Sequence, residues 1–179
     1  MSRLVAIAKV DDIFQEYRNT PIGRLLEFQN LKRHLDNYKH AQILIGMCMD
    51  NRKHLRRPDN FAYIIRTGGA NLRYSEFKIS YAIAVGNIQH IALIGHNNCG
   101  MTNLISRKDQ FISGLVNNAG WNKESAEKHF MNSAPMFEIG NEIDFVISEA
   151  KRLRLKYPKI TIAPMHYNVD DNQLYLLKE

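Results

Sequence analysis

The sequence predicts an α/β protein with a mainly parallel central sheet flanked by helices. The stretches Gln42–Arg52 and Ile91–Met101 each begin with a short apolar run rich in leucine and β-branched residues, which is typical of strands buried on both faces of a parallel sheet. A similar run at Phe61–Arg66 and a helical pattern at Ser75–Gly86 lie between them. This succession of strand, connector, strand, helix and strand indicates the α/β class.

Length and composition favour one domain. The chain has 179 residues, of which 45% are hydrophobic, enough for a single core over residues 1–179. We expect an N-terminal helical arm over residues 1–39 and an α/β core over residues 40–179. There is no apolar run long enough to cross a membrane and no convincing signal peptide, so we expect a cytoplasmic protein.

The N-terminal arm contains two predicted helices. The first spans about Val10–Tyr17. In the second, Thr20 is the expected cap, Pro21 suits the first turn, and apolar residues recur at helical spacing to about residue 36: Ile22, Leu25, Leu26, Phe28, Leu31 and Leu35. The apolar face of this helix covers either its own sheet or a second subunit, and the pattern leaves both open.

The rest of the core completes the sheet. Residues 109–140 show no clear periodicity, although Lys123–Met131 has helical character and Pro135 is expected to interrupt regular structure after it. A strong helical pattern at Asn141–Tyr157 precedes a fourth strand at Ile160–Met165, and Gln173–Leu177 alternates like an edge strand.

The strand order follows from three side chains. Cys48 ends the first predicted strand, and His96 and Cys99 follow the third. These side chains meet only if the first and third strands are neighbours, which predicts the order 2-1-3. With the last two strands added, we expect the order 2-1-3-4 with a C-terminal edge strand. The ligands then lie at the carboxyl ends of the strands, where open α/β sheets bind ligands.

These three side chains predict a zinc site. Thiolate and imidazole ligands suit Zn²⁺, and a set of three protein ligands leaves a fourth position open, as in catalytic sites. Cys48 and Cys99 are the only cysteines of the chain; a redox pair is the alternative interpretation.

Asp50 and Arg52 stand next to the first ligand. Asp50 either fills the fourth zinc position or accepts a hydrogen bond from zinc-bound water. Arg52 is placed to hold that carboxylate in a bidentate pair and keep it ionised.

The net charge is +6, so a nucleic-acid partner has to be considered. The basic groups Lys53–Arg57 and Lys151–Lys156 lack interleaved aromatic residues, and such residues are needed to stack bases. We therefore do not expect nucleic-acid binding. A solvated helix face accounts for the second group, and the first adjoins the predicted metal site.

The two motifs resemble those of β-class carbonic anhydrases. The Cys-x-Asp-x-Arg and His-x-x-Cys-Gly motifs of that family are matched in full by Cys48, Asp50, Arg52, His96, Cys99 and Gly100. Arg66–Asn71 is similar to the family's Arg-Asn-x-x-Asn segment, and Met165–Val169 stands where the family has His-Gly-Trp-x-Tyr-Asp.

The resemblance implies a function and a set of site residues. It implies zinc-dependent, reversible hydration of carbon dioxide to bicarbonate and a proton by attack of zinc-bound hydroxide, in a homodimer or dimer of dimers. The implied metal ligands are Cys48, His96 and Cys99. The implied catalytic residues are Asp50 and Arg52, and the implied substrate-pocket residues are Arg66, Gly68, Gly69 and Asn71.

Departures from the family pattern affect the pocket. The Arg66–Asn71 segment is one residue longer than usual and has Thr67 in place of Asn. Lys39 stands where many members have Gln, and Ile45 where the allosteric members have Trp, so bicarbonate-controlled closure is not expected. The alternatives are a zinc-binding, non-catalytic or regulatory paralogue, and a hydrolase of carbon disulfide or carbonyl sulfide on the same scaffold.

Overall fold

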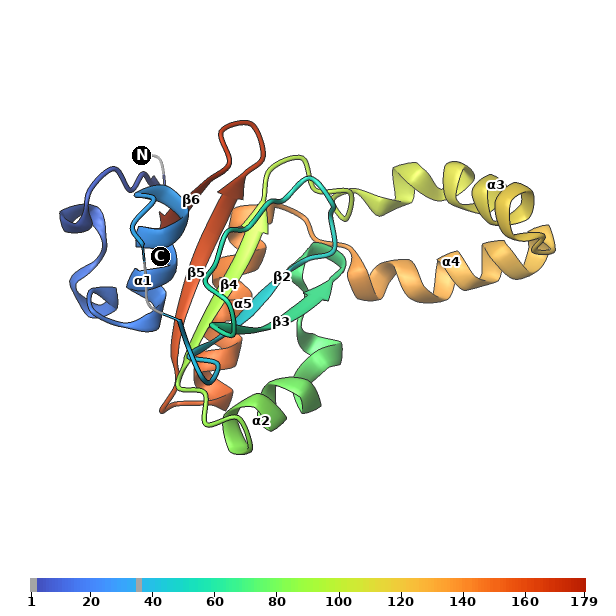
Figure 1. The fold of residues 1–179 in the computed structure, drawn as a ribbon. Coiled ribbons are helices and arrows are strands. Elements are labelled where there is room, and N and C mark those ends of the chain that lie inside the picture. Colours follow the sequence, from blue (N-terminus) through green and yellow to red (C-terminus); the bar gives the residue numbers. More distant parts are fainter. Residues whose placement is uncertain (1–2, 35–36) are drawn as a thin grey trace.

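The computed structural model describes residues 3–34 and 37–179, which form a six-stranded sheet flanked by helices (Figure 1). The strands are β1 (Leu4–Val5), β2 (Ile43–Cys48), β3 (Ala62–Thr67), β4 (His90–His96), β5 (Thr161–Asn168) and β6 (Gln173–Leu177). The α-helices are α1 (Pro21–Asn30), α2 (Glu76–Ala84), α3 (Lys108–Ala119), α4 (Lys123–Phe137) and α5 (Glu142–Lys156). Among the described residues, no helix is long and apolar enough to cross a bilayer. The predicted α/β class is confirmed.

The strand order is β1-β6-β5-β4-β2-β3. Strands β3, β2, β4 and β5 are parallel neighbours, which is the predicted order 2-1-3-4. The prediction that the C-terminal strand forms the edge is wrong, because β1 pairs antiparallel with the outer side of β6, with Leu4 opposite Leu177. A strand of two residues is too short to show an alternating pattern in a sequence.

Helices cover both faces of the sheet. Ile22, Leu25 and Leu26 of α1 share one core cluster with alternate residues of β2 and β4. Helices α2 and α5 cover the other face. There Ile79 and Val146 share a second core cluster with the residues of β2 and β4 whose side chains point to that face, such as Leu44 and Leu93. The N-terminal helix therefore lies on its own sheet, and β2 is buried along its whole length.

The N-terminal segment departs from the prediction at two points. The helix expected over Val10–Tyr17 is instead a pair of short 3-10 helices, Val10–Asp12 and Gln15–Tyr17. Helix α1 ends at Asn30 rather than near residue 36, because Lys32 adopts a φ of 55° and the Arg33 amide donates back to the Glu27 carbonyl. Leu35 and residue 36 lie outside the described residues.

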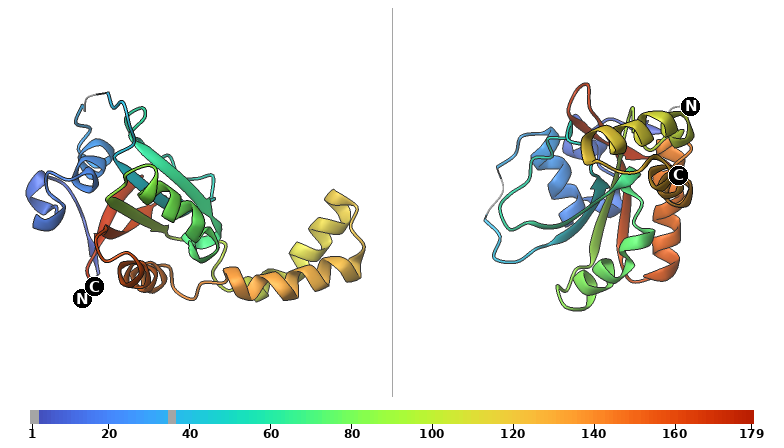
Figure 2. Two further views of the ribbon diagram at one scale, coloured as in Figure 1. Left: turned by 90° about the horizontal axis from the view of Figure 1, so that it is seen from below. Right: turned by 90° about the vertical axis from the view of Figure 1, so that its right-hand side faces the viewer.

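Helices α3 and α4 pack against each other and project beyond β3, away from the sheet (Figures 1 and 2). The helix predicted at Lys123–Met131 is confirmed, but it continues to Phe137 with Pro135 inside its last turns. Only Ile112, Ala126 and Phe130 are buried among the residues of these two helices. So little burial explains why residues 109–140 show no amphipathic pattern.

Candidate metal centre

Three buried side chains meet at the carboxyl edge of the sheet. Cys48 is the last residue of β2 and His96 the last of β4, and these strands are parallel neighbours. Cys99 follows in the turn after β4, where Asn98 has a φ of 54° that turns the chain back. The sulfur and imidazole nitrogen atoms all lie within 4.8 Å of one another. The predicted juxtaposition is thus present.

The donor set fits a zinc ion. The Cys48 and Cys99 sulfurs are 3.9 Å apart and both cysteines are free; two sulfurs at ~2.3 Å from a tetrahedral Zn²⁺ lie roughly 3.8 Å apart. Nδ1 of His96 donates to the Asn97 carbonyl at 2.9 Å, which leaves the lone pair on Nε2. That Nε2 is enclosed and has no hydrogen-bond partner within the described part of the chain, so a metal ion would satisfy it.

The two thiols interact strongly. Their mutual hydrogen bond lowers the pKa of the Cys48 thiol, and His96 contributes in the same direction against the effect of burial. The same hydrogen bond, together with burial, raises the pKa of Cys99. The thiolate form that a metal ligand requires is thus favoured at Cys48, and a divalent cation would displace protons from the pair.

Arg52 holds the Asp50 carboxylate beside this cluster. Its Nη2 donates to Asp50 Oδ2 at 2.7 Å and its Nε to Oδ1 at 3.0 Å, while its backbone amide donates to Oδ1 at 2.9 Å. Arg52 Nη2 also donates to the Asn98 carbonyl at 2.8 Å, which joins the loops that carry the two cysteines. These hydrogen bonds hold the pKa of Asp50 well below its usual range. Asp50 Oδ2 is 3.9 Å from His96 Nε2.

The four residues predicted to line the substrate pocket, Arg66, Gly68, Gly69 and Asn71, have different surroundings. Arg66 donates from Nη1 to the Asp50 carbonyl at 3.3 Å. A Cβ added to Gly68 would lie 2.9 Å from Met101 Sδ, and Gly69 has a φ of 62°. Asn71 is buried; its side-chain Nδ2 donates a hydrogen bond to the Met136 carbonyl, and its Oδ1 accepts one from the Arg73 backbone amide. Substrate contact by these four residues stays a prediction.

An apolar hollow of about 330 Å³ adjoins the cluster. It lies under the α3–α4 hairpin and is lined by Met49, Gly68, Met101, Leu104, Phe111, His129, Phe130, Ser133, Ala134 and Phe137. Met49 directly follows Cys48, and Met101 packs against the buried group of Cys48, Cys99 and Ile139. The sequence did not predict this hollow, because most of its lining comes from the segment without a pattern.

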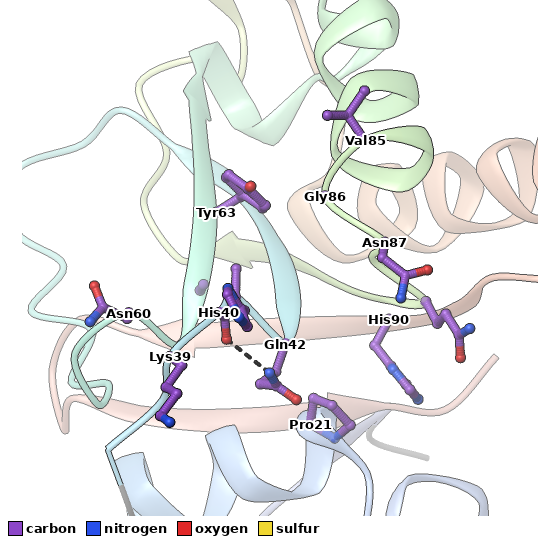
Figure 3. Close-up of a pocket in the computed structure, with 13 residues that line it drawn as sticks. Pro21, Lys39, His40, Gln42, Asn60, Tyr63, Val85, Gly86, Asn87 and His90 are labelled. Atoms are coloured by element: carbon purple, nitrogen blue, oxygen red, sulfur yellow. Dashed lines mark hydrogen bonds between the residues drawn. The ribbon is translucent and has the colours of Figure 1, made fainter.

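A second hollow, of about 950 Å³, lies at the opposite end of β2 (Figure 3). Lys39, His40, Tyr63 and His90 are among its lining residues, and the Gln42 side chain donates to the His40 carbonyl there at 2.8 Å. Cys48 is the last of the six residues of β2 and this hollow lies at the other end of the strand, a distance of roughly 15–20 Å. Within its own chain, Lys39 is thus remote from the metal cluster.

Two residues near the cluster were not predicted. Glu142, at the start of α5, accepts a hydrogen bond from the Cys99 amide at 3.2 Å. Lys53 is buried, with an exposed fraction of 3%; the sequence placed its basic group beside the site but gave the residue no role there. The sequence could have placed Lys53 near the cluster, because it lies three residues after Asp50. No feature of the sequence placed Glu142 there.

The fold and the cluster together define an α/β protein with a buried Cys–His–Cys centre that could hold a metal ion. No family model matches the chain, and no curated protein matches its sequence. Its likeness to known proteins is therefore structural.

Solved structures show which fold this is. β-Carbonic anhydrase isoform I of Trichomonas vaginalis superposes with a TM-score of 0.62 at 19% identity, over 84% of this chain and 91% of that one. A carbonic anhydrase from Streptococcus mutans superposes with a TM-score of 0.60 at 15% identity, over 97% of this chain and 99% of that one. A carbon disulfide hydrolase superposes with a TM-score of 0.55 at 19% identity, over 92% of this chain and 91% of that one. The chain has the β-carbonic anhydrase fold, as the motifs implied.

Proposed function

We propose that this protein is a zinc-dependent β-class carbonic anhydrase that reversibly hydrates carbon dioxide to bicarbonate and a proton. The observation that carries the proposal is the position of the arginine-held Asp50 carboxylate beside the Cys48–His96–Cys99 cluster. A purely structural zinc site needs no such carboxylate. The non-catalytic alternative is therefore disfavoured.

The chain's residues have distinct roles in this proposal. Cys48, His96 and Cys99 would hold the ion, which when bound lowers the pKa of a water molecule to about 7 and so supplies a nucleophile near neutral pH. Arg52 orients Asp50 and keeps it ionised. Asp50 would then act as a hydrogen-bond acceptor that orients the nucleophile, or would itself serve as a fourth ligand.

A second candidate reaction is the hydrolysis of carbon disulfide or carbonyl sulfide. The apolar hollow supports it, because Met49, Met101 and Phe137 offer a binding surface for an apolar, polarisable substrate beside the cluster. A carbon disulfide hydrolase also shares the fold over most of both chains.

We further propose one domain over residues 1–179, an arm over residues 1–39 and assembly as a homodimer or dimer of dimers. Support for assembly comes from α2 and the residues that flank it, which expose the large apolar side chains of Tyr74, Phe77, Tyr81 and Val85 near the edge strand β3 (Figure 1). Apolar side chains gathered in this way are typical of a protein interface. Sedimentation of the purified protein tests this; a monomer at micromolar concentration would contradict it.

The reaction is tested by comparing substrates on one zinc-loaded sample. Stopped-flow hydration of carbon dioxide is followed with a pH indicator, and release of hydrogen sulfide from carbon disulfide and carbonyl sulfide is measured in parallel. The proposal predicts that the carbon dioxide rate is the highest. Sulfide release without carbon dioxide hydration would establish the second candidate instead.

A further inference from the structure

Lys53 is a buried lysine without a partner. Its exposed fraction is 3%, and its Nζ is enclosed with no hydrogen-bond partner in the described ranges 3–34 and 37–179. Lysine side chains normally extend until the ammonium reaches water. An enclosed ammonium without a counter-charge is strongly unfavourable. The fold therefore retains a costly group close to the metal centre.

The charges around Lys53 belong to the metal centre. Burial lowers the pKa of Lys53, whereas Cys48, Asp50 and Cys99 act to raise it, and Arg66 opposes them. Conversely, the charge of Lys53 acts on Cys48, Asp50 and Cys99 to lower the pKa of each. The ammonium is thus within electrostatic reach of both sulfurs and of the carboxylate.

Asp50 already has a partner. Both of its oxygens accept hydrogen bonds from Arg52, and the Arg52 guanidinium balances its charge. The polar side chains that interact most strongly with Cys48 are Cys99 and His96, and Cys48 also packs against apolar residues. The Arg52 guanidinium also acts on Cys99, but its hydrogen bonds go to the Asp50 carboxylate and the Asn98 carbonyl. Lys53 is a positive group without a hydrogen-bond partner among the described residues whose charge acts on both sulfurs.

The charge of a loaded centre explains why such a group would be kept. A divalent ion with two thiolates and a neutral imidazole has no net charge, and any anion in the fourth position makes the centre negative. In a buried site with few water molecules, that negative charge is stabilised by a nearby cation.

We propose that Lys53 is the buried counter-charge of the Cys48–His96–Cys99 centre, and that it stabilises the metal-loaded state at the expense of the metal-free fold. The inference rests on the zinc site of the proposed function but not on the reaction. It predicts different effects of removing the charge on two quantities, the zinc affinity and the stability of the metal-free protein. Removing the charge lowers zinc affinity, and it leaves the metal-free protein equally stable or more stable.

The test uses Lys53→Met, which keeps an unbranched apolar side chain but removes the ammonium, with Lys159→Met at an exposed position as the matched control. Zinc dissociation constants are measured by competition with a chromophoric chelator, and urea unfolding is measured on the metal-free proteins. We expect Lys53→Met to weaken zinc binding by about 10-fold or more, as changes around metal ligands typically do. Its metal-free urea midpoint should equal or exceed that of the wild type.

Lys53→Gln, which keeps a polar head without the charge, is measured alongside and should weaken zinc binding similarly. Unchanged zinc affinity in both variants, or a metal-free fold destabilised by Lys53→Met, would show that Lys53 only fills space and would overturn the inference. Lys53-dependent zinc binding in a protein that does not hydrate carbon dioxide would overturn the proposed function and leave this inference standing.

Discussion

The guanidinium of Arg52 bridges Asp50 and Asn98, with Nη2 at 2.7 Å from the Asp50 carboxylate and 2.8 Å from the Asn98 carbonyl. One side chain thereby fixes the carboxylate next to Cys48 and the turn that presents Cys99. The orientation of Asp50 and the shape of the metal centre are consequently coupled, and single substitutions can separate their contributions.

Asp50→Asn should reduce carbon dioxide hydration by about 100-fold or more while zinc stays bound, because the amide is nearly isosteric but cannot act as the same charged acceptor. Stopped-flow kinetics and zinc content are measured on one sample. Asp59→Asn, at an exposed position before β3, is the matched control and should behave as the wild type. Normal turnover in zinc-replete Asp50→Asn would remove Asp50 from the mechanism.

Cys48→Ser should lose nearly all bound zinc, since a serine hydroxyl is a far weaker ligand than a thiolate. Zinc per chain is determined after gel filtration, and circular dichroism checks the fold. His54→Gln, which changes an exposed histidine near the site, should retain zinc. A fully loaded Cys48→Ser protein would refute the ligand assignment.

Gly69→Ala should destabilise the protein by about 1–2 kcal/mol. The residue has a φ of 62°, and an added Cβ would lie 3.0 Å from Ile139 Cγ2; an L-residue in the left-handed region carries a penalty of that size. Urea midpoints are compared with those of Gly100→Ala, where an added Cβ meets nothing within 4 Å. Equal midpoints for the two variants would contradict the loop conformation.

His90 should make stability pH-dependent. Burial lowers the pKa of this histidine, so the folded state favours the neutral ring. The corresponding stability is present above the unfolded pKa of about 6.5 and is lost as the pH falls through the folded pKa. Urea unfolding from pH 7.5 to 5 should therefore show a smaller loss for His90→Gln than for the wild type, and the exposed control His40→Gln should follow the wild type. Parallel curves for His90→Gln and the wild type would argue against this.

The sequence predicted the parts that depend on buried strands. The apolar runs ending at Cys48 and His96 predicted the strands, and the need to bring those ligands together predicted that β2 and β4 are neighbours with β3 on the far side of β2. The Asp50–Arg52 pair was also predicted and has the expected bidentate geometry. These features leave strong local signals, because full burial on both faces and close spacing restrict the residues allowed.

Other features had no local signal. Strand β1 is too short for a pattern, and the α3–α4 hairpin buries too few residues for a clear periodicity. The basic group that contains Lys53 was expected beside the site, but burial of the Lys53 ammonium depends on tertiary packing and could not be predicted. The apolar hollow brings Met49 together with residues more than 50 positions away, which no single stretch of sequence reveals.

The most direct test of the central claim is carbon dioxide hydration by stopped flow, with zinc content determined on the same sample and the chelator-stripped protein as control. The account predicts rapid hydration that is lost on stripping and restored by Zn²⁺. A protein that carries a full complement of zinc and shows no hydration above the uncatalysed rate, from neutral to alkaline pH, would contradict it.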